Sequence, residues 1–430
     1  MAYLLAIVVA IVAYKIAFLD AVLADPFFAI YGLVVVGYLV SRFGIALLYR
    51  APAGSAAELP AVAIVMPAFN EEAAIATSLR SLLAVDYPAA LLEIVAVNDG
   101  STDRTAEELD AVAAAAGGRI NVIHFARNRG KRAAMAAGIR ATSAEVVAFV
   151  DSDSTLEPEA LARLVRSFAD PAVGAVCGHA DVQNVSESWL TKMQAVRYFV
   201  AFRIVKAAES VFGAVTCCSG CFSAYRRTAI LPHLEWWESQ RFLGRLSTFG
   251  DDRSLTNCVL RDWSVVYDAT AVSHTIVPTR LKQFIKQQTR WKRSWTRESL
   301  IVARFIWRKH PLAALAVYTG IVLPLIAPIT VLRATVWHPL VGGLGMPVLY
   351  VVGVYAMALV YSLTYAVMKR RFDALWLYGV AFVFFYLGFL VWQTYYAILT
   401  ARSSSWGTRP ATAGAATAFE RAASPAREAA

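Results

Sequence analysis

The chain has 430 residues, of which 58% are hydrophobic, so it is too long for one small domain and too apolar for an ordinary soluble protein. Its 41 Lys and Arg residues and 31 Asp and Glu residues give a formal net charge of +10. The orientation of membrane segments and the binding of anionic phosphates explain this excess, so no nucleic acid partner is expected.

Five apolar runs are each long enough to cross a hydrocarbon core, which takes about 20 residues. They are Tyr3–Ala24, Phe27–Tyr49, Leu312–Leu332, Pro347–Met368 and Ala374–Thr400. The first run holds Lys15 and Asp20 and leads straight into the second, so we interpret it as an anchor and not as a cleaved signal peptide. Between Arg50 and His310 the composition is that of a soluble α/β domain.

The distribution of Lys and Arg predicts the orientation in the membrane. The loop Asp20–Pro26 has none, whereas Arg42 and Arg50 flank the other end of the second run. Because basic loops stay in the cytoplasm, the N-terminus and the central domain are expected there. Lys369–Arg371 bring the chain back inside, so we interpret Ala374–Thr400 as a bent or re-entrant segment, with a single span as the alternative.

The five cysteines all lie within residues 177–258, in the part expected to be cytoplasmic, where disulfides are rare. Cys218 and Cys221 form a lone C-x-x-C motif without a second pair or clustered histidines. We therefore expect packing residues here and not a zinc site.

Four apolar strands are expected in the first half of the central domain, each ending in polar residues. They are Val62–Pro67, Glu93–Val97, Ile120–His124 and Glu145–Val150. Helices are expected after the first three, so the order is β-α-β-α-β-α-β and predicts a doubly wound, mostly parallel sheet. Ligands bind at the carboxyl edge of such sheets. Each polar cluster alone has a structural alternative, such as Asp99 capping a helix, but all four lie at this one edge.

The fourth strand is followed by Asp151-Ser152-Asp153. If the strand continues through these residues, the two carboxylates point to the same side. Two such carboxylates can hold Mg²⁺ or Mn²⁺, which takes oxygen ligands and bridges to diphosphate oxygens. Lys131, in the cluster Asn128–Lys131, is a second candidate countercharge for a diphosphate.

The second half of the domain is less periodic. We expect one helix over Trp189–Val211 and a loop of small residues, an aromatic residue and cations over 217–227. Asp251 and Asp252 follow Gly250 and begin a helix, so either can be an N-cap. If the domain transfers a group to a hydroxyl, it needs a carboxylate to take the proton, and Asp252 is the candidate.

The segment Leu281–His310 is expected to be an amphipathic helix. It has nine Lys or Arg residues against one acidic residue, with aromatic residues such as Trp291 and Trp295 interleaved. A helix that is basic on one side and aromatic on the other is suited to the membrane interface. It contains Gln287-Gln288-Thr289-Arg290-Trp291. This helix can therefore lie at the membrane interface and also contact the catalytic site.

The four motifs Asn98-Asp99-Gly100-Ser101, Asp151-Ser152-Asp153, Gly250-Asp251-Asp252-Arg253 and Gln287–Trp291 are specific as a set. Together they resemble the processive inverting glycosyltransferases of family two, which include cellulose, chitin and hyaluronan synthases and the nodulation chitooligosaccharide synthases. The last motif distinguishes these from single-addition members such as dolichyl-phosphate sugar synthases.

Within that group the chain is most similar to bacterial hyaluronan synthases. The segments that carry this resemblance are Met193–Val211, Phe242–Gly244, Gly250–Asn257, Lys286–Ser299 and Ser405–Arg409, so it extends over residues 63–409. It implies a GT-A-like domain that makes hyaluronan from UDP-GlcNAc and UDP-GlcA. Where that family usually has Ser-Gly-Pro, this chain has Ser219-Gly220-Cys221, so a chitin-like polymer made from UDP-GlcNAc alone is the alternative.

The resemblance also implies roles for individual residues. Nucleotide-sugar contacts fall on Ala68, Asn70, Glu71, Asp99, Lys131, Asp151, Gln287, Arg290, Trp291 and Trp406. Acceptor contacts fall on Ser219, Gly220, Cys221, Asp251 and Trp291. Asp153 would ligate Mg²⁺ or Mn²⁺, Asp252 would be the general base, and Trp406 would be a mobile gate over the nucleotide.

Five parts of the chain are therefore expected. Residues 1–50 form two transmembrane helices, 51–280 the cytoplasmic glycosyltransferase domain and 281–310 the interface helix. Residues 311–400 form transmembrane or re-entrant helices, and 401–430 form a partly disordered cytoplasmic tail. The expected protein is a multi-pass protein of the plasma membrane, with UDP-sugars, the growing polysaccharide and the bilayer as its partners.

Overall fold

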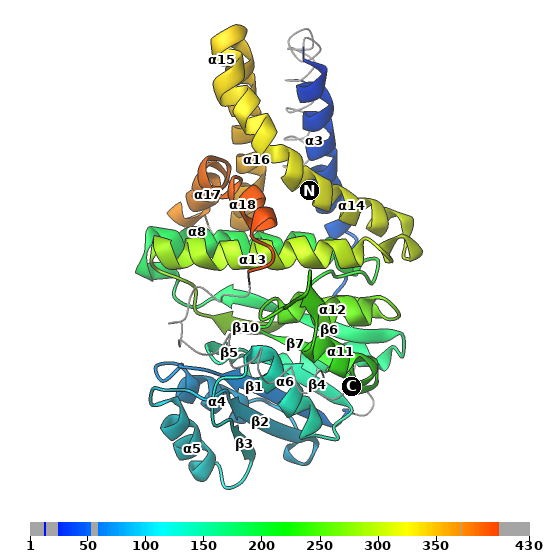
Figure 1. The fold of residues 1–430 in the computed structure, drawn as a ribbon, viewed down its shortest axis with the longest axis vertical. Helices are drawn as coiled ribbons and strands as arrows, with labels where there is room; N and C mark the ends of the chain where they lie inside the picture. Colours follow the sequence, from blue (N-terminus) through cyan, green and yellow to red (C-terminus); the bar gives the residue numbers. More distant parts are fainter. Residues whose placement is uncertain (1–12, 14–24, 53–58, 371, 404–430) are drawn as a thin grey trace, which may run out of the picture.

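The computed structural model describes residue 13 and residues 25–52, 59–370 and 372–403. Most of the predicted first membrane helix (Tyr3–Ala24) and the predicted tail, with Trp406, lie outside these residues. In Figure 1 the described residues form an α/β unit at the bottom, two long helices across the middle and a group of apolar helices at the top.

The α/β unit is built on one eight-stranded sheet with the order β3-β2-β1-β4-β7-β6-β10-β5. The strands are β1 (Val62–Ala68), β2 (Leu92–Asn98), β3 (Ile120–His124), β4 (Val146–Phe149), β5 (Ser154–Leu156), β6 (Val173–Val182), β7 (Ser223–Arg226) and β10 (Ser264–Thr275). Strands β3, β2, β1 and β4 pair in parallel, as do β6 and β10. Strand β7 runs antiparallel between the two groups, and β5 runs antiparallel at the edge. The mostly parallel α/β sheet predicted from the sequence is confirmed.

Helices cover both faces of this sheet. They are α4 (Ile75–Leu83), α5 (Thr105–Ala115), α6 (Lys131–Arg140), α7 (Ala160–Val165), α10 (Arg227–Ile230), α11 (Leu234–Glu238) and α12 (Asp251–Leu260), with a small hairpin of β8 (Arg241–Phe242) and β9 (Arg245–Leu246) before α12. Val65 of β1 shares a buried cluster with Ile139 of α6. Its neighbour Ile64 shares another with Leu79 of α4 and Leu109 of α5. Because both faces are covered, β1 is apolar at every position, as in a doubly wound sheet.

Two of the predicted helices differ from the structure. The single helix predicted over Trp189–Val211 is α8 (Trp189–Val200), then a π-helical segment (Ala201–Lys206), then α9 (Ala207–Ser210). Helix α13 (Leu281–Val302) begins where predicted but ends before His310, because the chain turns through a short 3₁₀ segment. His310 itself has ψ 133°, which fits the steric restriction on a residue that precedes a proline.

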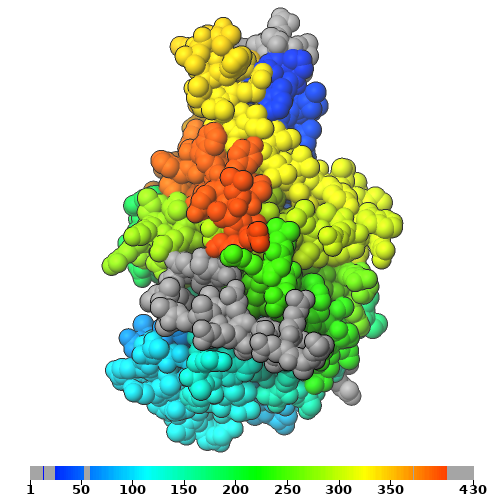
Figure 2. Space-filling model, viewed as in Figure 1, coloured from blue at the N-terminus to red at the C-terminus, as the bar shows by residue number. Residues whose placement is uncertain are grey.

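Three helical segments are long and apolar enough to cross a membrane: 26–46, 311–341 and 345–369. They correspond to α3 (Pro26–Ala46), α14 (Pro311–Leu332) with its π-helical continuation (Arg333–Trp337) and α15 (His338–Val341), and α16 (Gly345–Lys369). A fourth candidate is a pair of segments bent by 44°, 374–390 and 393–399, which fits either a broken span or a re-entrant loop. It comprises a 3₁₀ turn (Ala374–Trp376), α17 (Leu377–Phe385), a π-helical segment (Tyr386–Leu390) and α18 (Gln393–Leu399). Figure 2 shows the yellow residues around α15 and the blue residues of α3 projecting above the rest of the molecule.

Helices α8 and α13 form the layer between the sheet and these apolar helices (Figure 1). Phe284 of α13 is buried in a cluster with Leu190 of α8 and Phe382 of α17. On the side toward the sheet, Arg297 of α13 donates through Nη2 to the Phe249 carbonyl oxygen at 2.6 Å. Because α13 contacts both halves of the molecule, it can couple events in one to the other.

Candidate active site

A cavity of about 560 Å³ lies between the sheet and the apolar helices. All but two of the residues predicted to form the site line it: Ala68, Glu71, Asp99, Lys131, Asp151, Asp153, Ser219, Gly220, Cys221, Asp251, Asp252, Gln287, Arg290 and Trp291. The exceptions are Asn70, which does not line the cavity, and Trp406, which lies outside the described residues. The structure therefore brings together motifs that are more than 200 residues apart along the chain.

The polar residues after β1 and β2 fix the shape of one wall. Asn70, with φ 53°, accepts through Oδ1 from the Thr102 backbone N–H at 2.8 Å and so joins the two loops. Asp99 is buried, and its carboxylate accepts from the backbone N–H groups of Arg129 at 2.6 Å and Gly130 at 2.9 Å. Asp99 thus holds the loop that leads into α6, which begins with Lys131.

Lys131 and two aspartates form the charged floor of the cavity. The Lys131 ammonium donates to Asp151 Oδ1 in a short ion pair. Burial opposes the Lys131 charge, but Asp151 outweighs it, so the pKa of Lys131 is raised. Burial and then the neighbouring Asp151 carboxylate raise the pKa of Asp153 to about 6. Negative charge is therefore crowded at Asp153, which forms no ion pair with another described residue, since Lys131 is paired with Asp151.

Asp151 and Asp153 both reach the cavity, but not along a continued strand as the sequence predicted. Strand β4 ends at Phe149, and Asp151–Asp153 form a turn in which the Ser154 N–H donates to the Asp151 carbonyl oxygen at 3.0 Å. The alternation of a continued strand is therefore not what places both carboxylates in the cavity. Among the described residues, no group of three or more His, Cys, Asp and Glu side chains could hold a metal by itself.

The loop Ser219-Gly220-Cys221 closes over this floor. A Cβ atom on Gly220 would lie 3.0 Å from Asp151 Oδ2 and 3.2 Å from Lys131 Nζ. A larger residue at this position would therefore push against the ion pair, which would have to shift by a few tenths of an ångström. Cys221, at the position where the similar synthases usually have proline, is 9% exposed and lines the cavity.

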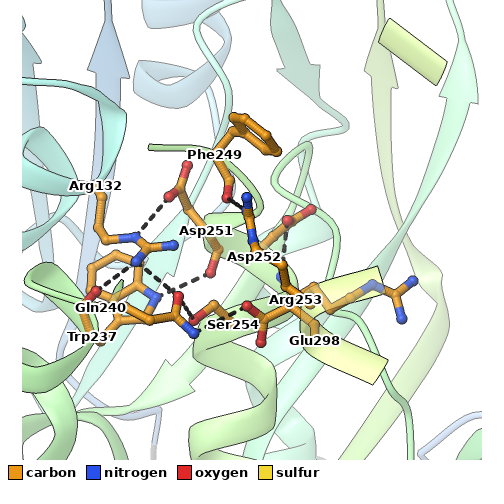
Figure 3. A network of polar contacts seen from close by, with 10 residues as sticks. Arg132, Trp237, Gln240, Phe249, Asp251, Asp252, Arg253, Ser254 and Glu298 are labelled. Carbon is orange, nitrogen blue, oxygen red and sulfur yellow. Dashed lines mark hydrogen bonds and ion pairs between the residues drawn. The ribbon is translucent and has the colours of Figure 1, made fainter. Parts of the chain in front are cut away.

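Asp251 and Asp252 begin α12, but their carboxylates point in different directions (Figure 3). Asp252 is half-buried and lines the cavity, with Oδ2 3.9 Å from Cys217 Sγ. Asp251 is buried, and its Oδ1 accepts from Arg132 Nε at 2.9 Å. The structure thus gives the Asp251 carboxylate a protein partner, and its predicted contact with the acceptor stays a prediction.

A buried polar network extends from Asp251 to α13 (Figure 3). Arg132 Nη1 donates to Gln240 Oε1 at 3.0 Å, and Gln240 Nε2 donates to Glu298 Oε1 at 3.1 Å. Asn257 of α12 donates through Nδ2 to Glu298 Oε2 at 3.0 Å. We name the chain Arg132, Asp251, Gln240 and Glu298 the α12–α13 network.

Asp251 is the only member of this network that the sequence motifs mark as a site residue. One signal was available for Glu298, because it is the only acidic residue within Leu281–His310. Arg132 and Gln240 carry no such signal, since each lies among ordinary helix or turn residues. Only the tertiary fold brings them together.

The far end of the cavity reaches the apolar helices. Gln287, Arg290 and Trp291 of α13 line it, and the Trp291 ring lies 6.5 Å from the Tyr198 ring of α8. Burial raises the pKa of Tyr198, which the Asp153 carboxylate also raises and the Arg197 charge lowers. Tyr198 therefore lies close enough to both the acidic floor and Arg197 to feel their charges.

We call these two regions the acid end and the membrane end of the cavity. The acid end is defined by Asp99, Lys131, Asp151, Asp153 and Asp252. The membrane end is defined by Arg197, Lys292, Pro324, Tyr386 and Thr394, all of which line the same cavity. None of these five was predicted as a site residue.

Comparison with known proteins identifies the family of this chain. The model of the family "Glycosyl transferase family 2" matches residues 63–231. A hyaluronan synthase of Streptococcus pyogenes is 38% identical over 297 residues, which are 66% of this chain and 68% of that protein. An N-acetylglucosaminyltransferase of Rhizobium leguminosarum bv. viciae is 32% identical over 370 residues, which are 85% of each chain.

Among solved structures, a mannosyltransferase of Pyrobaculum calidifontis in complex with GDP-Man and Mn²⁺ has a TM-score of 0.57 and 21% identity. The match covers 84% of this chain and 99% of that one. At this identity the likeness shows the fold alone, and it confirms the expected GT-A-like domain.

The fold and the cavity define a sugar-transferring enzyme whose α/β unit is joined to apolar helices. The chain belongs to glycosyltransferase family 2, in the group that contains the bacterial hyaluronan synthases and the rhizobial N-acetylglucosaminyltransferases.

Proposed function

We propose that this glycosyltransferase is a processive hyaluronan synthase that uses UDP-GlcNAc and UDP-GlcA and passes its product through its own membrane helices. The observation that supports this most strongly is the single cavity that joins the catalytic acids to the apolar helices. An enzyme that adds one sugar to a soluble acceptor has no need for this continuity, and the Gln287–Trp291 motif disfavours an enzyme that adds one sugar to a lipid. The relative named hyaluronan synthase supports the choice of product.

The acid end would bind the nucleotide-sugar. Asp151 and Asp153 offer hard oxygen ligands, and the raised pKa of Asp153 reports negative charge that a divalent cation would neutralise. Mg²⁺ or Mn²⁺ held there, chiefly by Asp153, would stabilise the negative charge that develops on the leaving diphosphate. Lys131 would supply a second positive charge, held in position by its ion pair with Asp151.

Asp252 would take the proton from the acceptor hydroxyl. Its carboxylate lines the cavity, and among the described residues its neighbour Asp251 is already bound to Arg132. The hydroxyl oxygen would then attack the anomeric carbon from the face opposite UDP, so that the configuration inverts in one step. Gln287, Arg290 and Trp291 would cover the diphosphate and stack on the acceptor sugar, with the Ser219–Cys221 loop beside them.

We further propose that the α/β unit lies in the cytoplasm of a plasma-membrane protein. The Lys and Arg residues near Arg50 and at Lys369–Arg371 support this orientation by the positive-inside rule. Donor sugars would then be bound in the compartment where they are made, and the polymer would leave through the apolar helices.

A GlcNAc homopolymer is the second candidate product. Cys221 in place of the usual proline favours it, because the loop that holds Cys221 lies against the acid end. The rhizobial relative, named an N-acetylglucosaminyltransferase, matches over a larger share of this chain than the streptococcal one does.

Donor requirements of the purified enzyme distinguish the two products. The enzyme is incubated with radiolabelled UDP-GlcNAc, with and without UDP-GlcA, and the polymer is sized by gel electrophoresis. Hyaluronan synthesis predicts high polymer only when both donors are present. High polymer from UDP-GlcNAc alone would contradict the proposal and establish the homopolymer.

A further inference from the structure

Two cations at the membrane end of the cavity have no acidic partner among the described residues. Arg197 of α8 and Lys292 of α13 both line the cavity. In the part of the chain that the structure describes, neither forms an ion pair with a carboxylate. We call Arg197 and Lys292 the cation pair.

The two positive charges are close enough to affect each other. Burial and then the Arg197 charge lower the pKa of Lys292 to about 8. The effect of Arg197 is unfavourable, since like charges in a poorly solvated site repel one another. A protein that keeps such a pair beside a cavity gains stability when an anion binds between them.

The protein partners of the cation pair are neutral. The Lys292 ammonium donates to the Leu390 carbonyl oxygen and to Thr394 Oγ1, the latter at 3.0 Å. An ammonium has three N–H donors, so one is left for a ligand. The Arg197 guanidinium lies over the Phe382 ring, with Cζ 5.2 Å from the ring centroid.

Aromatic rings adjoin the cation pair. Lys292 Nζ lies 5.3 Å from the centroid of the Tyr386 ring, which also lines the cavity. Trp291 and Tyr198, the residues next to each cation in the sequence, form the ring contact nearer the acid end. Rings beside cations are what an acidic sugar needs, because its apolar face packs on the rings while its carboxylate binds the charges.

We propose that the cation pair is a subsite for the carboxylate of a uronic acid residue in the growing polymer. The inference rests on the proposed function, since only a polymer that contains uronic acid brings a carboxylate to this place. The diphosphate of the donor is the other anion in the cavity, but the proposed function already gives it the metal, Lys131 and Arg290 as counter-charges. A neutral GlcNAc polymer would leave the cation pair without a ligand.

The position of the subsite suits it to hold the growing polymer between additions. It lies beyond Trp291, on the side of the apolar helices, where the chain that has already been made would be held between additions. Binding there would slow the release of the acidic polymer and lengthen the product. It would also discriminate against a neutral chain, which makes no charge-assisted hydrogen bond.

Binding of short oligosaccharides tests the subsite directly. A hyaluronan tetrasaccharide and chitotetraose, which is neutral and equally long, are titrated into the full-length purified enzyme in the presence of UDP. We expect the acidic tetrasaccharide to bind more tightly, with a preference that falls as salt is added. Lys292→Gln and Arg197→Gln should each weaken its binding about tenfold and leave chitotetraose unchanged, because a hydrogen bond between charged groups is lost.

Two control variants and two control measurements keep the result specific. Lys292→Arg retains the charge and should retain the preference, whereas Lys282→Gln removes an exposed charge from the same helix and should have no effect. UDP affinity and the thermal unfolding temperature should match the wild type in every variant. In synthesis assays, Lys292→Gln should give shorter polymer than Lys282→Gln.

Several outcomes would overturn the subsite. Equal loss of both tetrasaccharides would mean general damage to the cavity, and no loss would mean that the cation pair does not bind the polymer. Weaker UDP binding would assign it to the diphosphate. If the wild type makes the two-sugar polymer but Lys292→Gln changes nothing, the subsite alone fails; if the wild type needs only UDP-GlcNAc, the proposed function fails with it.

Discussion

The acid end and the membrane end of the cavity are built in different ways. The acid end takes three aspartates from loops that follow strands, within residues 99–153, together with the first residue of α6 and the start of α12. The membrane end takes one residue from each of five helical segments, across residues 197–394. One end therefore depends on the regular geometry of a sheet, and the other depends on how distant helices pack. The α12–α13 network and the length of α13 connect the two.

The largest effect is expected at the acid end. Asp252→Asn removes the only base that we assign to the reaction, so polymer synthesis should fall by about 10² to 10⁴. UDP binding should stay near that of the wild type, because Asp252 is not assigned to the nucleotide. Synthesis is measured as incorporated radiolabel, and UDP affinity by calorimetry. Asp262→Asn, an exposed change just beyond the same helix, is the matched control. Polymer made by Asp252→Asn at the wild-type rate would remove Asp252 from its role.

Asp153→Ala should remove metal-dependent binding of UDP at the acid end. UDP is titrated into the enzyme with Mn²⁺ and again with EDTA, and the wild type should bind it more tightly with the metal. The variant should lose that difference, because Asp153 is the main metal ligand in our proposal. If Mn²⁺ still increases the UDP affinity of the variant, Asp153 is not the main metal ligand. The affinity measured in EDTA serves as the internal control.

Arg132→Ala should destabilise the α12–α13 network, which connects the two ends of the cavity. Arg132 and Asp251 are each 5% exposed, so the substitution leaves a buried carboxylate without its partner. Breaking such a pair costs about 3–5 kcal/mol of stability. Arg140→Ala breaks a pair from the same helix to Glu238, but the Arg140 side chain is 48% exposed, and less than about 1 kcal/mol is expected. The thermal unfolding temperatures of the two variants are compared. If Arg132→Ala and Arg140→Ala lower this temperature equally, the α12–α13 network does not stabilise the contact between α12 and α13.

A smaller effect is expected from Gly250→Ala, where α12 begins against α13. Gly250 has φ +82°, and a Cβ atom there would lie 1.9 Å from Ser294 Oγ and 2.7 Å from Ser294 Cβ. Gly244 has φ +81° but has no atom within 4 Å of its Cβ position. Both substitutions strain the backbone, by about 1–2 kcal/mol each. Only Gly250→Ala should also lower polymer synthesis, since α12 must shift away from α13; equal activity of the two variants would contradict this.

The sequence predicts the acid end well, for physical reasons. Strands β1 and β4 are buried along their whole length, so they are unbroken apolar runs, and polar residues mark the point where each one ends. Strand β2 is buried over its second half, and β3 is only partly buried, but polar residues follow both. Asp99, Lys131 and Asp153 could therefore be placed at one edge from sequence alone. The turn at Asp151–Asp153 was missed because a strand end and a turn look alike in a short polar segment.

The membrane end could not be predicted in the same way. Arg197 and Lys292 each lie on a helix with several other cations, so nothing in the sequence distinguishes them from residues that face solvent or headgroups. Their proximity arises from the packing of α8 and α13 against α17 and α18. The sequence likewise did not predict that the helix Trp189–Val211 divides into α8, a π-helical segment and α9. The apolar periodicity does not change where the π-helical segment begins.

Translocation in sealed vesicles tests most directly whether the two ends work as one path. The full-length enzyme is reconstituted with its α/β unit facing outward, both donors are supplied outside, and hyaluronan lyase is then added outside. If the polymer passes from the acid end through the membrane end, it accumulates in the lumen and resists the lyase until detergent opens the vesicles. Polymer that the lyase digests completely before detergent is added would contradict a single path from sugar transfer to export.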